Sequence, residues 1–114
     1  MTMADVRTWT AVCEVATVPK AFGVAALLSG GEQVAVFRTE AGEVYAIGNI
    51  DPIAGAAVLS RGIVGDAGGV PVVASPIYKE RYDLRTGACL DDESVSVPSY
   101  PVRVTDGVIH VGSA

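Results

Sequence analysis

Few side chains in this sequence have the chemistry of a nucleophile or a metal ligand. The chain holds two cysteines, Cys13 and Cys89, and one histidine, His110. A nucleophilic cysteine needs a base or a cationic setting, and neither cysteine has a histidine near it in the sequence. Both are predicted to be buried structural thiols. His110 alternates with Ile109 and Val111, which predicts a solvent-side or capping role rather than general-base catalysis.

The acidic and hydroxyl side chains form no catalytic set either. The adjacent acids Asp91–Glu93 predict a solvated turn, because a hard cation needs further oxygen ligands around it. Asp51, Ser75 and Tyr78 lie in two Pro-containing loops, but one carboxylate among three groups is a poor metal site. Asp51 is instead predicted to cap its own Asp-Pro turn. There is no Ser-His-Asp set, no catalytic carboxylate pair and no zinc-ligand spacing.

The two Pro-containing loops organise the middle of the chain. The first, residues 49–56, reads Asn-Ile-Asp-Pro-Ile-Ala-Gly-Ala. The second, residues 74–79, reads Ala-Ser-Pro-Ile-Tyr-Lys, and Arg-Tyr-Asp-Leu-Arg-Thr-Gly follows at 81–87. This arrangement resembles the cluster-binding region of Rieske [2Fe–2S] proteins. Those proteins carry a Cys-x-His loop, then a Cys-Pro-x-His-Gly loop that runs into Phe-Asp-Leu-x-Thr-Gly.

By this resemblance the frame of the site is kept and its ligands are replaced. Asp51 and Ile53 stand at the first Cys and His positions, Ser75 and Tyr78 stand at the second pair, and Lys79 replaces the Gly. A Rieske centre needs two thiolates on one iron and two imidazoles on the other, which a chain with one histidine cannot supply. We therefore expect a colourless protein in which Ile53 and Tyr78 fill the space between the loops.

Further motifs are similar to those of the small subunit of assimilatory NAD(P)H-dependent nitrite reductase, a family of Rieske-like domains without cluster ligands. The resemblance extends from about Trp9 to Val111. It is carried by Val34–Phe37, Val44–Ile47, Asp51-Pro52, Leu59–Gly62, Ser75-Pro76, Tyr78-Lys79, Asp83-Leu84, Thr86-Gly87 and Tyr100–Arg103. It implies a non-catalytic subunit without a cofactor of its own. Its partner would be a large subunit that carries FAD, an iron–sulfur cluster and sirohaem and reduces nitrite to ammonium.

The former cluster positions and their neighbours are the expected partner interface. These residues are Asp51, Pro52, Ile53, Ala54, Ser75, Pro76, Ile77, Tyr78 and Lys79. Two other functions stay open at this point. One is a free-standing binding or regulatory module for another oxidoreductase. The other is an electron carrier with an unusual cluster, which would need ligands that the chain lacks.

Composition narrows the class of protein. A length of 114 residues predicts one domain, residues 1–114. Apolar residues make up 50% of the chain and charged residues 18%, which fits either a face covered by a partner or a Val/Ala-rich core. A net charge of −5 without a basic cluster argues against nucleic-acid binding. No signal peptide, membrane span or cysteine framework is visible, so a cytoplasmic protein with reduced thiols is expected.

The pattern along the chain predicts an all-β protein, a Rieske-like antiparallel β-sandwich with two protruding loops. Strands are expected at 9–14, 24–28, 33–38, 44–47, 72–74, 81–84, 100–105 and 108–111. Gly-containing turns at 29–32 and 106–107 predict hairpins. The connections are too short for crossover helices. Residues 61–71 are Gly-rich and are predicted to be irregular, and their pattern fits no nucleotide-binding fingerprint.

Overall fold

The computed structural model describes residues 8–113, which form short antiparallel strands and two single turns of 3₁₀ helix. The strands are β1 Trp9–Glu14, β2 Phe22–Leu27, β3 Gln33–Arg38, β4 Val44–Gly48, β5 Ile50–Asp51, β6 Ala56–Ala57, β7 Ile63–Ala67, β8 Val70–Ala74, β9 Arg81–Asp83, β10 Ser99–Tyr100, β11 Val102–Thr105 and β12 Val108–Gly112. The 3₁₀ turns are Val15–Thr17 and Leu59–Arg61. The predicted all-β antiparallel class is confirmed. No helix in the described chain is long and apolar enough to cross a membrane.

Strand β3 lies between the two cores of the molecule. It lies between β2 and β4 in the sheet β10-β4-β3-β2, and its run Val34–Phe37 is buried on both faces. Because alternate residues of a strand point to opposite faces, this run contributes to two separate cores. One core is Val18, Leu28, Val34, Val36, Ala46, Ile109 and Val111. The other is Ala35, Phe37, Ile47, Leu59, Val73, Tyr82, Leu84, Cys89 and Val97.

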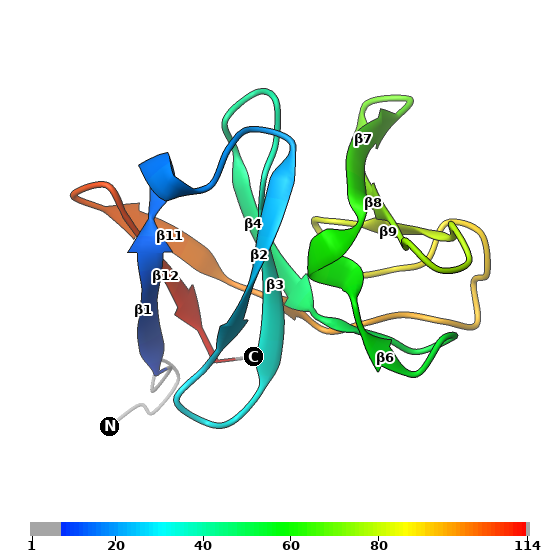
Figure 1. Cartoon of the computed structure of the whole chain (residues 1–114), viewed down its shortest axis with the longest axis horizontal. Helices are drawn as coiled ribbons and strands as arrows, with labels where there is room; N and C mark the ends of the chain where they lie inside the picture. The colour runs from blue at the N-terminus through cyan, green and yellow to red at the C-terminus, as the bar shows by residue number, and fades with distance from the viewer. Residues whose placement is uncertain (1–7, 114) are drawn as a thin grey trace, which may run out of the picture.

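Each core joins this sheet to a different neighbour (Figure 1). The first joins it to the sheet β1-β12-β11, whose β11–β12 hairpin turns at Asp106-Gly107 as predicted. The second joins it to the sheet β7-β8-β9. The small β5–β6 hairpin and the β8–β9 connection carry the two Pro-containing loops. The loops therefore stand on the second core, at the end of the molecule away from β1 and β12.

One prediction about the backbone is wrong. Residues 61–71 are not an irregular excursion, because β7 and β8 pair in register from Ile63↔Ala74 to Ala67↔Val70. The hairpin turns at Gly68-Gly69, where both residues have positive φ, 62° and 94°. Such a pair is the glycine signature of a two-residue hairpin turn. The hairpin holds β8 in the sheet, and β8 leads into the second loop.

The thiols and the histidine lie outside the loops. Cys89 is buried in the second core, as predicted. Cys13 is only partly buried on β1, so the prediction of a fully buried thiol is wrong for it. His110 lies on the β12 face opposite Ile109 and Val111, with its Nδ1 3.2 Å from the carbonyl oxygen of Val108. The three side chains therefore sit in structural positions.

Candidate functional site

The Asp51 carboxylate is completely buried at the base of the first loop. Its Oδ1 accepts hydrogen bonds from the backbone N–H of Ile53 at 2.9 Å and of Ala54 at 3.3 Å. The Asp51 carbonyl oxygen accepts a third bond from Gly55 N at 2.7 Å, which closes the loop. The predicted cap of the Asp-Pro turn is therefore confirmed. Both carboxylate oxygens can still accept hydrogen bonds from partners elsewhere in the fold.

Those partners come from the second loop and the strand after it. Ser75, also fully buried, donates its hydroxyl to Asp51 Oδ2 at 2.5 Å, and the hydroxyl of Tyr82 on β9 donates to Oδ1 at 3.3 Å. Ser75 Oγ in turn accepts from the backbone N–H of Ile77 at 3.3 Å. A carboxylate accepts several hydrogen bonds at once, and charge-assisted O–H bonds are the short, strong ones. Asp51 thus joins the two loops within the core.

Glu80 completes this buried network. It is 7% exposed, and its Oε1 has no N–H or O–H donor in the described chain. Burial raises the pKa of the Glu80 carboxyl, and hydrogen bonding to Asp51 raises it further. For Asp51, burial alone would raise the pKa, but hydrogen bonds from Ser75, Glu80 and the loop amides bring it below its usual value. The surroundings of the pair therefore favour the neutral form of Glu80 and the charged form of Asp51.

This arrangement predicts a pH-dependent stability that Glu80→Gln removes. Because the folded pKa of Glu80 is raised, its stabilising contribution is present at low pH and is lost as pH rises through that folded pKa. The wild-type free energy of unfolding should therefore fall as pH rises through the folded pKa of Glu80. A glutamine at this position can donate to Asp51 at any pH. Urea unfolding from about pH 5 to about pH 8 measures this slope. The exposed Glu40→Gln variant should keep the wild-type slope, and an unchanged slope in Glu80→Gln would contradict the assignment.

The outer positions of the loops face solvent. Ile53 is 42% exposed, Ile77 48% and Tyr78 64%. The expectation that Ile53 and Tyr78 fill the space between the loops is therefore wrong, because Ser75, Tyr82 and Glu80 close that space from inside. The stability loss expected for a buried Ile53 does not apply to a side chain so exposed. Together with Ala54, these residues form an exposed, largely apolar surface, which we call the two-loop tip.

The residues at the former ligand positions do not fit the [2Fe–2S] cluster that the resemblance to Rieske proteins implies. The two thiolate positions are Asp51 and Ser75, and these bond to one another. The two imidazole positions, Ile53 and Tyr78, offer no nitrogen. Within residues 8–113 no group of three or more His, Cys, Asp or Glu side chains is placed to hold a metal ion. The chemistry of the donor set is that of a hydrogen-bonded cross-link, not of an iron site.

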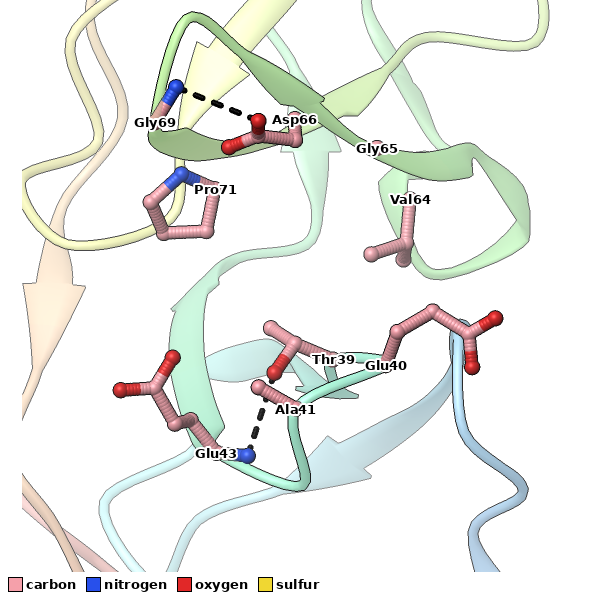
Figure 2. Close-up of a pocket in the computed structure, with 9 residues that line it drawn as sticks. All are labelled: Thr39, Glu40, Ala41, Glu43, Val64, Gly65, Asp66, Gly69 and Pro71. Atoms are coloured by element: carbon pink, nitrogen blue, oxygen red, sulfur yellow. Dashed lines mark hydrogen bonds between the residues drawn. The ribbon is translucent and has the colours of Figure 1, made fainter.

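A cleft of about 300 Å³ lies between the β3–β4 turn and the β7–β8 hairpin (Figure 2). It is lined by Thr39, Glu40, Ala41, Glu43, Val64, Gly65, Asp66, Gly69 and Pro71. Two of its polar side chains accept hydrogen bonds from backbone N–H groups of their own turns. Thr39 Oγ1 accepts from Glu43 N at 3.1 Å, and Asp66 Oδ2 accepts from Gly69 N at 3.2 Å. The cleft is lined by no cysteine, histidine or lysine, and it lies outside the two loops.

The sequence places Asp51 and Ser75 at former cluster-ligand positions, but it does not reveal that Tyr82 and Glu80 join them. Burial and the charge of Asp51 both raise the pKa of Tyr82, which keeps its hydroxyl a donor. Tyr82 was expected only as a strand residue and Glu80 was not considered. The available signal was a glutamate between two short strands of the core, directly after a loop that carries a buried serine.

Comparison with known proteins places these features in a family. Residues 8–112 match the family described as Rieske-like [2Fe-2S] domain. The chain is 46% identical over 104 residues to the nitrite reductase (NADH) small subunit of Salmonella typhimurium, covering 90% of this chain and 95% of that one. A crystal structure from Mycobacterium tuberculosis, assigned as an NADH-dependent nitrite reductase small subunit, superposes with a TM-score of 0.93 at 51% identity and covers 96% of this chain and 98% of the other.

A third relative differs in length. The chain is 44% identical over 107 residues to part of the nitrite reductase [NAD(P)H] large subunit of Klebsiella oxytoca, covering 94% of this chain but 11% of that protein. The chain covers 95% of the Salmonella small subunit, so its similarity extends over nearly the whole of that protein. The fold agrees with this similarity. The chain belongs to the Rieske-like [2Fe–2S] domain family and, within it, to the nitrite reductase small subunits.

Proposed function

We propose that this chain is a non-catalytic small subunit of an NAD(P)H nitrite reductase and that it acts by binding the large subunit through the two-loop tip. The observation that carries the proposal is the pairing of Asp51 with Ser75. This pairing replaces the cluster chemistry inside and leaves Ile53, Ile77 and Tyr78 exposed outside. Exposed apolar side chains gathered at one end of a small domain are typical of a protein interface.

A relative supports the choice of partner. In Klebsiella oxytoca a stretch similar to this chain is part of the nitrite reductase large subunit itself. Two units that occur in one polypeptide in a relative work at high effective concentration there. As separate chains they need an interface of sufficient size and complementarity to reach the same arrangement. The exposed tip is the part of this chain that we assign to that interface.

The chemistry of the complex is assigned to the large subunit. We infer that FAD, an iron–sulfur cluster and sirohaem are all held there and that nitrite is reduced to ammonium there with NADH or NADPH. No nucleophile, base or metal set among residues 8–113 supports a catalytic role for this chain. We place the complex in the cytoplasm, where its two unpaired cysteines stay reduced.

The test is reconstitution with a purified nitrite reductase large subunit. The two chains should co-elute as one complex on size exclusion, and NAD(P)H-dependent nitrite consumption should require the large subunit. The small chain alone should consume no nitrite. Nitrite turnover by the small chain alone would overturn the assignment of the chemistry. Failure of the two chains to co-elute at micromolar concentration would favour a free-standing module that serves another oxidoreductase.

A further inference from the structure

We propose that the Asp51–Ser75 hydrogen bond takes the mechanical place of an iron–sulfur cluster, and that Asp51 and Ser75 are positioning residues that hold the two-loop tip in its docking geometry. The cross-link itself is a property of this chain alone. Only the docking step rests on the proposed function. The proposal assigns a role to a buried polar network that a non-catalytic domain would otherwise have little reason to keep, since buried polar groups cost free energy unless they are fully paired.

The positions of the two residues give the first part of the argument. In a Rieske centre the two thiolates bind the same iron, so that iron joins one loop to the other. By their place in the loop motifs, Asp51 and Ser75 stand at these two thiolate positions. Here their side chains meet directly, with the Ser75 hydroxyl oxygen 2.5 Å from Asp51 Oδ2. The link between the loops is thus kept while the metal chemistry is lost.

Among the hydrogen bonds of the described chain, the bond from Ser75 to Asp51 is the one that joins the first loop, residues 49–56, to the second, residues 74–79. Glu80, directly after the second loop, also acts on the Asp51 carboxylate and lowers its pKa, so both interactions between the two segments end on Asp51. The remaining bonds of each loop are internal. Gly55 N donates to Asp51 O at 2.7 Å in the first loop, and Lys79 N donates to Ser75 O at 3.1 Å in the second. Without the cross-link each loop would be closed on itself but not fixed to its neighbour.

The cross-link also reaches the tip directly. The backbone N–H groups of Ile53 and Ala54 bind Asp51 Oδ1, and the N–H of Ile77 binds Ser75 Oγ. The amides that carry the exposed side chains of Ile53 and Ile77 are therefore held by the two side chains that form the cross-link. A change in the buried pair must move or release the tip, although neither buried residue can touch a partner.

The backbone conformation of the second loop also supports the proposal. Lys79 has a φ of +68°, a left-handed conformation that costs a non-glycine residue free energy. By the resemblance, cluster-binding relatives carry glycine at this position. Such strain persists only where the surrounding contacts determine the backbone firmly. Here those contacts are the Lys79 N–H bond to Ser75 O and the Ser75 N–H bond to the Glu80 carbonyl at 2.9 Å.

The test uses Ser75→Ala, which removes the cross-link but leaves the cap of the first loop. Amide hydrogen exchange is followed by NMR at Ile53, Ala54 and Ile77, with Val36 in β3 as the core reference. We expect exchange at the tip to accelerate roughly tenfold or more relative to Val36, the factor set by loss of one charge-assisted hydrogen bond. The matched control is Tyr82→Phe, which removes another hydroxyl from the same carboxylate without unlinking the loops. It should leave the ratio of tip to core exchange unchanged.

Affinity for a purified large subunit is the second readout. Ser75→Ala should bind roughly tenfold or more weakly than wild type under conditions where both are fully folded, and Tyr82→Phe should not. If Ser75→Ala does not fold, Ser75→Cys replaces the hydroxyl by a weak donor of similar shape and should give the same selective acceleration. Unchanged tip exchange in a folded variant would overturn the cross-link. Accelerated exchange with unchanged affinity would overturn the positioning role, and absence of wild-type binding would instead overturn the proposed function.

Discussion

Replacing Asp51 by alanine is expected to lower the free energy of unfolding by about 3–5 kcal/mol, because it leaves several buried donors without an acceptor at once. The hydroxyls of Ser75 and Tyr82 both donate to this carboxylate inside the core. Glu80, whose pKa is raised by burial and by hydrogen bonding to Asp51, loses this partner as well. Each unsatisfied buried polar group costs about 1–3 kcal/mol, and partial relaxation keeps the sum below the simple total. For a domain of this size that is a large fraction of the whole stability.

Denaturant unfolding of wild type and variant measures this loss. The matched control is Asp66→Ala, since Asp66 is an exposed aspartate that also caps a turn, through Gly69 N. Its removal should cost about 1 kcal/mol or less, as an exposed cap does. A loss in Asp51→Ala no larger than that of the control would show that the carboxylate only caps its own loop. In that case the links to Ser75 and Tyr82 would carry no net stabilisation.

The elements that sequence alone predicts well are those whose signal is local. The run Val34–Phe37 is continuously apolar because β3 is covered on both faces, and its bounds are predicted correctly. Asp106-Gly107 between apolar runs gives the β11–β12 hairpin. Gly68-Gly69 carries the same kind of signal for β7–β8. Gly65 and Pro71 are poor strand residues, yet both lie within the paired strands, so this Gly-rich segment is a hairpin and not the irregular segment predicted.

At the site, too, contacts between residues close in sequence are predicted, and contacts between distant residues are not. The cap of the Asp51 turn involves residues two and three positions away, and it is predicted. Tyr82 lies thirty-one residues from Asp51 in sequence, and only the packing of β9 on the second core brings its hydroxyl to the carboxylate. The error over Ile53 and Tyr78 has a geometric cause. The inner and outer ligand positions of the loops were treated alike, whereas the inner pair closes the gap and the outer pair faces solvent.

A negative charge placed on the two-loop tip is expected to abolish binding to the large subunit. Ile77 is 48% exposed at the tip, and its side chain would be covered in the proposed complex. A glutamate there would be desolvated without a partner, which costs several kcal/mol and corresponds to roughly a hundredfold or greater loss of affinity. Ala54→Glu, on the other loop, should act in the same direction. Both changes alter only side chains outside the buried network and keep the backbone N–H groups that bond to it, so both variants should remain folded.

The matched control for this charge is Val104→Glu. Val104 is also an aliphatic side chain with 48% exposure, but it lies on β11, at the end of the molecule opposite the loops (Figure 1). Co-purification with a large subunit, after unfolding curves have shown each variant to be folded, separates the two surfaces. Loss of binding in Ile77→Glu and Ala54→Glu with retention in Val104→Glu would locate the interface at the tip. Retained binding in both tip variants would move the interface to another face, because no interface tolerates an unpaired buried charge on each of its two loops without loss.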